Sequence, residues 1–491
     1  MIHNSDARAL KASAAQRLRE GAYSEAAGLF EQLTELDPRE PNHWFNLGYS
    51  RRMARDYAAA LEAYAEALTR GVSGAEDVHI NRAVILSEYF HDMPAAATEL
   101  QKAVAANPRA LTAWLNLGSL HEDLGDSAAA RGAYSAALRV DRGSGRATAR
   151  LAAIDLHESG PEAVLPGLRE AAQRDWPTAQ DAAEVRFALG NALDAAGDYR
   201  AAFEAVAEGN HRALSGRPSR SRYDPASVEA LVDVLIALPP TATAEALDTG
   251  ETPIFICGMF RSGSTLVEQL LARHSQVTAG GELEFIPAMV HEDLRPYPQA
   301  LAEAPGGRLG ALRDRYLNQL RRIFPVAQRV TDKRPDNFLH IALIKAIFPQ
   351  ARIVHTRRHP LDNVLSVFFL YFGDDVSYSD RLDDIVHFYI QYRRLMDHWQ
   401  VRFAPDIHAV DYDALVANPR SELEALLAFL GLDWDENCLT PQGRDAVRTP
   451  SNWQVRQPLH RRSSGRWRNY AEGLEVARRR LADRGLLDTG D

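Results

Sequence analysis

The sequence predicts two domains: an all-α solenoid followed by an α/β domain with a mostly parallel sheet. Residues 1–214 are alanine-rich, and their apolar residues follow a helical period. In residues 251–491, short apolar runs alternate with helical segments, which is typical of a parallel sheet covered by helices. Residues 215–250 are polar and turn-rich, so we expect a linker there that carries one short helix.

Bulk composition excludes several classes of protein. Hydrophobic residues make up 46% of the chain and charged residues 25%, which is typical of a soluble globular protein. The net charge of −10 argues against nucleic-acid binding. The N-terminal MIHNSDARALKASAAQ lacks the apolar segment of a signal peptide, and no apolar run reaches the ~18 residues that a membrane helix needs. Because only Cys257 and Cys438 occur, we expect no disulfide framework. Together, these observations predict a cytoplasmic protein without membrane or nucleic-acid partners.

A repeat organises the N-terminal region. Two matching sets of residues lie 70 residues apart: Trp44, Leu47, Gly48, Ala60, Tyr64 and Ala67, and then Trp114, Leu117, Gly118, Ala130, Tyr134 and Ala137. The small residues allow two helices to approach, and the aromatic residues fill the layer between units. The pattern resembles the tetratricopeptide repeat (TPR) family, although residues 143–180 fit the period poorly. The resemblance implies a solenoid whose concave face binds a peptide or a protein partner.

Residues 254–265 predict an anion-binding turn between a strand and a helix. The apolar run 254–257 is too short for a helix, and Gly258 starts a loop with the P-loop spacing G-x-x-x-x-G-x-[ST]. The amide groups and the dipole at the start of the following helix favour an anion. Ser264 replaces the lysine that would reach the β- and γ-phosphates of ATP. A single 5′-phosphate ester needs less positive charge, and Arg261 can supply a planar fork.

The loop Arg261-Ser262-Gly263-Ser264-Thr265, directly after an apolar strand, resembles the 5′-phosphosulfate loop of sulfotransferases. These enzymes use 3′-phosphoadenosine-5′-phosphosulfate (PAPS). The resemblance extends over residues 251–475 and implies that this P-loop-like turn binds PAPS through all five of its residues.

Two side chains are candidates for the transfer chemistry. Glu282 follows a glycine pair, and a carboxylate beside an anion site can take a proton from an attacking hydroxyl. The position of Glu282 resembles that of the base in protein-tyrosine sulfotransferases. Lys333 stands at the end of a predicted strand, Gln328–Thr331, and matches the family's lysine that stabilises the bridging oxygen as sulfate leaves. The alternative interpretations are a solvated loop carboxylate or a helix N-cap for Glu282, and a surface turn lysine for Lys333.

A second strand–turn–helix junction follows at residues 352–372. Arg358 ends the strand and Ser366 lies two turns into the helix, a spacing that resembles the 3′-phosphate motif of sulfotransferases. We interpret Asp362 and Asn363 only as helix-start residues. Further along, the segment around Tyr412 resembles the one that follows the nucleotide site, which implies contact with adenine; a core tyrosine is the alternative.

The C-terminal stretch 456–468, RQPLHRRSSGRWR, has five arginines among its thirteen residues, although the protein is acidic. Such runs are solvated or bind anions. Sulfotransferases close the nucleotide site with a basic loop that ends in Gly-x-Trp, and residues 465–467 fit this pattern. The resemblance implies that Arg461, Arg462 and Ser463 or Ser464 face the 3′-phosphate or the sulfuryl group.

The resemblance implies in-line transfer of a sulfuryl group from PAPS to an acceptor hydroxyl, with PAP as the product and Glu282 and Lys333 as the catalytic residues. We expect no metal cofactor, because no cluster of His, Cys and Asp has metal-ligand spacing. Two other functions stay open. A P-loop kinase or ATPase conflicts with the missing lysine and with the Arg358–Ser366 pair. A TPR scaffold with a degenerate second domain conflicts with the presence of Glu282 and Lys333.

The acceptor is less constrained than the donor. A repeat array favours a peptide or protein, with tyrosine as one candidate. Protein-tyrosine sulfotransferases carry an arginine two residues after the base, which reads acidic residues around the target. Glu284 occupies that position here, so the sequence does not predict an acidic target motif. A small phenol, a sugar or a lipid hydroxyl is the alternative acceptor.

Overall fold

The fold is described here from a computed structural model, which covers residues 4–245, 252–440 and 462–487. It forms two compact units, Met1–Ile154 and Asp155–Asp491. The predicted fold class is confirmed, because helical repeats precede a five-stranded parallel sheet. Among the described helices, none combines the length and apolar character needed to cross a membrane.

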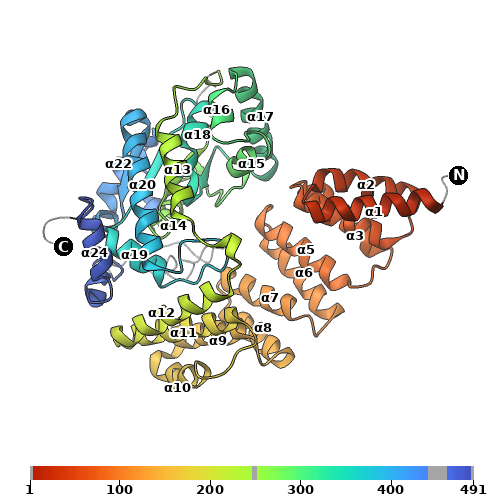
Figure 1. Cartoon of the computed structure of the whole chain (residues 1–491), viewed down its shortest axis with the longest axis horizontal. Coiled ribbons are helices and arrows are strands. Elements are labelled where there is room, and N and C mark those ends of the chain that lie inside the picture. Colours follow the sequence, from red (N-terminus) through yellow and green to blue (C-terminus); the bar gives the residue numbers. More distant parts are fainter. Residues whose placement is uncertain (1–3, 246–251, 441–461, 488–491) are drawn as a thin grey trace. The chain divides into compact units, whose positions relative to one another are not determined.

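The first unit consists of antiparallel helical pairs (Figure 1). Its helices are α1 (Asn4–Glu20), α2 (Tyr23–Leu36), α3 (Pro41–Met53), α4 (Tyr57–Thr69), α5 (Ala75–Glu88), α6 (Met93–Ala106), α7 (Leu111–Leu124), α8 (Ser127–Val140) and the first part of α9 (Gly145–Ser159). Gly48 and Gly118 mark two close helix approaches. A Cβ on Gly48 would lie 2.7 Å from the Tyr64 ring, and one on Gly118 would lie 2.5 Å from the Tyr134 ring. Both tyrosines are fully buried, so glycine and tyrosine together set the spacing within each pair.

The second unit begins with more helices and continues into the sheet domain. Its helices are α10 (Pro161–Ala171), α11 (Ala179–Ala195), α12 (Tyr199–Gly216), α13 (Pro225–Ile236), α14 (Ser264–Leu271), α15 (Phe285–Glu292), α16 (Gln299–Ala302), α17 (Gly306–Ile323), α18 (Ile341–Ile347), α19 (Pro360–Phe368), α20 (Leu382–Arg402), α21 (Tyr412–Ala417), α22 (Pro419–Leu430) and α24 (Glu475–Ala482). Short 3₁₀ helices are η1 (Ser219–Ser221), η2 (Pro335–His340), η3 (Ala404–Asp406), η4 (Glu436–Leu439) and η5 (Arg466–Tyr470).

The sheet places the ends of its strands side by side. Its strands are β1 (Ile254–Gly258), β2 (Val277–Thr278), β3 (Arg329–Lys333), β4 (Ile353–Arg357) and β5 (Ile407–Asp411), in the order β2-β3-β1-β4-β5. All four pairings are parallel, with Ile256 opposite Lys333 and Gly258 opposite Thr356. The carboxyl ends of β3, β1 and β4 therefore meet at one edge, which is where open α/β sheets bind ligands.

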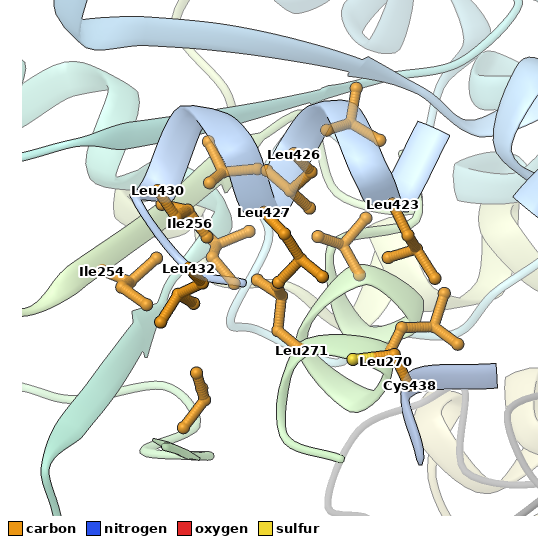
Figure 2. Packing of buried hydrophobic residues seen from close by; sticks show 14 of the residues in the cluster. Ile254, Ile256, Leu270, Leu271, Leu423, Leu426, Leu427, Leu430, Leu432 and Cys438 are labelled. Atoms are coloured by element: carbon orange, nitrogen blue, oxygen red, sulfur yellow. The ribbon is translucent and has the colours of Figure 1, made fainter. Parts of the chain in front are cut away.

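One face of the sheet is covered by α14 and α22. Figure 2 shows leucines of α22 lying over Leu270 and Leu271 of α14 and Ile256 of β1. The α22 leucines recur at helical spacing: Leu423, Leu426, Leu427 and Leu430. Each buried leucine contributes about 1.5–3 kcal/mol relative to exposure. This packing fixes α14 against β1, so it also fixes the loop between them.

Candidate functional site

The loop between β1 and α14 is shaped by two glycines that no larger residue could replace. A Cβ on Gly258 would lie 2.4 Å from the Thr356 carbonyl oxygen of β4. Gly263 has a φ of 101° and is the N-cap residue of α14. Because glycine has no side chain, it makes no side-chain capping hydrogen bond to the first turn of the helix. Ser262 is buried, and its Oγ lies 2.7 Å from the Thr356 Oγ1. The first amide groups of α14 therefore face the site without the usual side-chain acceptor.

Arg261 links the two junctions that the sequence predicts as separate anion sites. Its φ of 70° lies in the left-handed region, which is uncommon for a residue with a Cβ. Its Nε donates a hydrogen bond of 3.1 Å to the Oγ of Ser366 in α19. The Arg358 Nη1 in turn donates to the Arg261 carbonyl oxygen at 3.3 Å. Arg261, Arg358 and Ser366 thus lie together at the ends of β1 and β4.

Positive charge is concentrated at this place. Burial and, second, the charge of Arg358 lower the pKa of the Arg261 guanidinium to about 10. Burial also lowers the pKa of Arg358, while the Asp362 carboxylate acts in the opposite direction. The Nε of Arg358 is buried and has no hydrogen-bond partner among the described residues. Two half-buried guanidinium groups whose positive charges repel each other are suited to hold an anion.

Tyr412, the first residue of α21, covers the loop from the other side. A Cβ on Gly263 would lie 2.7 Å from the tyrosine ring. The Arg358 guanidinium lies over the same ring, 4.9 Å from its centroid. Tyr412 is half-buried, so one part of the ring is available to a ligand while the rest supports Arg358 and the glycine loop.

Glu282 and Lys333 form an ion pair. The Lys333 Nζ lies 2.6 Å from the Glu282 Oε1. The lysine side chain is 1% exposed and the glutamate side chain 38%, so the carboxylate lies on the solvent side of the pair. Lys333 is the last residue of β3, whereas the sequence placed it in the turn beyond a strand ending at Thr331. The strand end directs the ammonium group toward Glu282.

The segment that carries Glu282 is held by a buried network that the sequence did not reveal. Glu268 of α14 accepts hydrogen bonds from the Gly281 amide at 3.0 Å and from the Thr331 hydroxyl at 2.6 Å. Burial raises the pKa of Glu268, and the charge of Lys333 lowers it. A Cβ on Gly280 would lie 2.0 Å from the Thr331 carbonyl oxygen, so this glycine serves a close approach to β3. From the sequence, Glu268 is only a polar residue of the helix that follows the glycine loop, so its role in this network could not be predicted.

Glu284 is paired as well. Its carboxylate accepts a hydrogen bond from Arg334, and the same guanidinium lies 2.8 Å from Asp336 Oδ1. Behind Lys333, the carboxyl group of Asp332 is fully buried and accepts hydrogen bonds from Tyr316 and Asn337. Burial raises the pKa of Asp332 to about 7. Around the Glu282–Lys333 pair, the Arg334 guanidinium thus lies close to two carboxylates, those of Glu284 and Asp336.

Family comparisons place both parts of the chain. Residues 253–436 match the model of the sulfotransferase family, and residues 10–75 and 89–150 match a tetratricopeptide-repeat model. The chain carries TPR repeats and a sulfotransferase domain. It is 29% identical over 313 residues to an uncharacterized protein of Aquifex aeolicus (strain VF5), a match that covers 60% of this chain and 41% of that protein. The chain therefore spans less than half the length of this relative.

Two solved structures are among those similar to parts of this chain. The sulfotransferase domain of the Synechococcus PCC 7002 olefin synthase is 23% identical, with a TM-score of 0.35, over 46% of this chain and 91% of that one. The TPR protein YrrB, described as having an unusual peptide-binding site, is 18% identical, with a TM-score of 0.28, over 39% of this chain and 87% of that one.

A C-terminal segment, residues 463–467, contacts Arg358 and Asp362. Arg358 donates a hydrogen bond to the main-chain carbonyl oxygen of Ser463. Asp362, interpreted from the sequence only as a helix-start residue, accepts hydrogen bonds from the Gly465 amide at 2.6 Å and the Trp467 amide at 2.7 Å. Asp362 is therefore an anchor for this segment, and its position in the first turn of α19 gave no signal for that role.

The remaining predicted site residues divide into three groups. Ser264 is buried at the start of α14, and Thr265 is half-buried beside it. Arg462 is exposed. Arg461 lies outside the described residues. Among the described residues, no group of three or more His, Cys, Asp or Glu side chains has a metal-binding arrangement.

Proposed function

We propose that this protein is a cytoplasmic, PAPS-dependent sulfotransferase that sulfates an acceptor hydroxyl. The observation that carries the proposal is the Glu282–Lys333 ion pair at the end of β3, beside the glycine loop at the end of β1. A proton acceptor, a buried cation and a set of helix N-terminal amides are what a transfer from one anionic centre to a hydroxyl requires.

The residues present fit a donor that is anionic at both ends. The amide groups at the start of α14 suit the 5′-phosphosulfate. Arg358, with its buried Nε, and Ser366 suit the 3′-phosphate, and Tyr412 offers a ring face for adenine. When bound, PAPS supplies the sulfuryl group and leaves as PAP.

The chain's own residues have distinct tasks in this proposal. Glu282 removes the proton of the acceptor hydroxyl as the oxygen forms its bond to sulfur. Lys333 donates hydrogen bonds to the phosphate oxygen on which charge develops as the sulfur–oxygen bond breaks. Glu268 and Thr331 hold the Gly280–Gly281 segment, and this fixes the Glu282 carboxylate near Lys333. The pairing of Glu282 with Lys333 keeps both side chains ordered before substrates bind.

For the acceptor, we propose a peptide or protein tyrosine presented by a partner that the TPR repeats bind. Glu284 and Asp336 flank Glu282, and both of their carboxylates lie against the Arg334 guanidinium. An acidic target sequence would add like charge there, which disfavours it. The expected targets are therefore tyrosines with neutral or basic neighbours.

The test is transfer of ³⁵S from labelled PAPS to a panel of acceptors by the purified full chain. The panel contains tyrosine peptides with acidic, neutral and basic flanks, small phenols, glycans and lipid hydroxyls. We expect labelling with wild type and loss of labelling with Glu282→Gln, while Glu303→Gln, an exposed neighbour on the same domain, behaves like wild type. Absence of transfer to every acceptor, together with tighter binding of ATP than of PAP in a fluorescence titration, would refute the proposal in favour of a P-loop kinase or ATPase.

A further inference from the structure

The helical pair α11 and α12 packs onto α19, which carries Ser366, and onto η5, which carries Arg466. The ring of Phe203 in α12 lies 5.3 Å from that of Phe368 in α19 and 6.3 Å from that of Tyr470 in η5, between centroids. The buried Asn210 donates a hydrogen bond of 2.9 Å to the Phe368 carbonyl oxygen. A Cβ on Gly473 would lie 2.7 Å from the Phe203 ring. This interface is closely packed, so α12 supports the helix that carries Ser366.

Asp194, at the end of α11, binds both ends of η5. Its Oδ2 lies 3.0 Å from the Arg466 guanidinium, and its Oδ1 accepts a hydrogen bond from the Tyr470 hydroxyl. The same guanidinium lies over the rings of Phe369 at 4.8 Å and Tyr470 at 5.4 Å. Arg466 is thus held by one carboxylate and two aromatic faces; Asp194 and Phe369 come from elements distant in the sequence, and Tyr470 belongs to η5 itself.

The segment that Asp194 holds also contacts Arg358, the residue that we assign to the 3′-phosphate, and Asp362 beside it. The Ser463 carbonyl oxygen accepts from Arg358, and the Gly465 and Trp467 amides bind Asp362. The charge of Arg466 also lowers the pKa of Arg358. Arg466 therefore acts electrostatically on the residue that we assign to the 3′-phosphate.

We propose that Asp194 is a positioning residue for donor binding: it holds the segment 463–470 against Arg358, so that the site recognises the 3′-phosphate. A carboxylate of the helical pair is then part of the sulfotransferase machinery. This inference rests on the proposed function.

The experiment compares the affinity of the full chain for PAP and for adenosine 5′-phosphate, which lacks the 3′-phosphate. For Asp194→Asn we expect the Kd of PAP to rise about tenfold, with the Kd of adenosine 5′-phosphate and the kcat at saturating PAPS unchanged. Tyr470→Phe, which removes one of the two contacts, should raise the Kd of PAP about threefold. Glu204→Gln is the matched control, because this carboxylate of α12 is paired with Arg200 on the exposed surface.

Three outcomes separate the possibilities. An Asp194→Asn variant that binds both nucleotides more weakly by the same factor would show a general structural role and would overturn the inference. An unchanged or tighter Kd for PAP would overturn it as well. Wild type that does not prefer PAP over adenosine 5′-phosphate would refute the proposed function itself. If Asp194→Asn has a melting temperature too low for the titration, Tyr470→Phe carries the test alone.

Discussion

At the end of the site where Glu282 and Lys333 meet, called here the transfer end, two side chains form one ion pair on a segment held by a buried network. At the nucleotide end, Arg261, Arg358 and Ser366 come from three elements and share contacts with Tyr412 and the C-terminal segment. In the proposed function, the transfer end depends on the position of a few atoms, whereas the nucleotide end depends on accumulated positive charge. Substitutions at the two ends should therefore change different kinetic constants.

The largest expected effect separates the two ends directly. Glu282→Gln keeps the shape of the side chain but removes the proton acceptor, so kcat should fall about 10²- to 10⁴-fold. The Kd of PAP should change less than about twofold, because we assign the binding of the phosphates to other residues. Initial rates with labelled PAPS and a PAP titration measure both quantities. A large loss of PAP affinity would show that the two ends are not independent.

The second-largest expected effect tests the assignment of Arg358 at the nucleotide end. Arg358→Ala removes a half-buried guanidinium that also covers Tyr412, and the Kd of PAP should rise about 100-fold. Arg358→Lys keeps the charge and loses the planar fork, so it should fall between wild type and Arg358→Ala. Isothermal titration with PAP and adenosine 5′-phosphate gives the readout. If the affinities for PAP and for adenosine 5′-phosphate fell by the same factor, the assignment of Arg358 to the 3′-phosphate would be contradicted.

A third prediction concerns the buried carboxyl behind the transfer end. The pKa of Asp332 is raised to about 7 in the folded protein, while the unfolded chain ionises near the ordinary value. Between these two values the folded state binds more protons, so the free energy of unfolding falls as pH rises toward 7. Relative to Asp332→Asn, wild type should lose about 2 kcal/mol between pH 5 and pH 7.

Urea unfolding of both proteins at a series of pH values measures this difference. Asn can still accept the hydrogen bond from Tyr316, so the variant is a fair reference for the folded network. Parallel pH profiles for the two proteins would show that the Asp332 carboxyl ionises normally in the fold.

The smallest expected effect tests a single neutral acceptor at the nucleotide end. Ser366→Ala removes the hydroxyl that accepts from Arg261 Nε, and the Kd of PAP should rise about fivefold with kcat unchanged. Ser366→Thr retains the hydroxyl and should stay closer to wild type. A change in kcat with unchanged PAP affinity would place Ser366 at the transfer end instead.

The sequence by itself determined the classes of element and the residues with local signatures. The TPR period identified Gly48, Tyr64 and their counterparts, because residues that face a neighbouring helix recur at fixed spacing. The glycine spacing from Gly258 to Gly263 predicted the loop, because its backbone path tolerates no Cβ at these places.

Only the tertiary structure decided which of these residues meet. Glu268 binds Thr331 across 63 residues, Asp362 binds Gly465 across 103, and Asp194 binds Tyr470 across 276. Each of these carboxylates has a local pattern that any helix position could share, so no spacing in the sequence marks it. Their roles arise from the parallel order of the sheet and the packing of α11 and α12, which bring distant segments within hydrogen-bond distance.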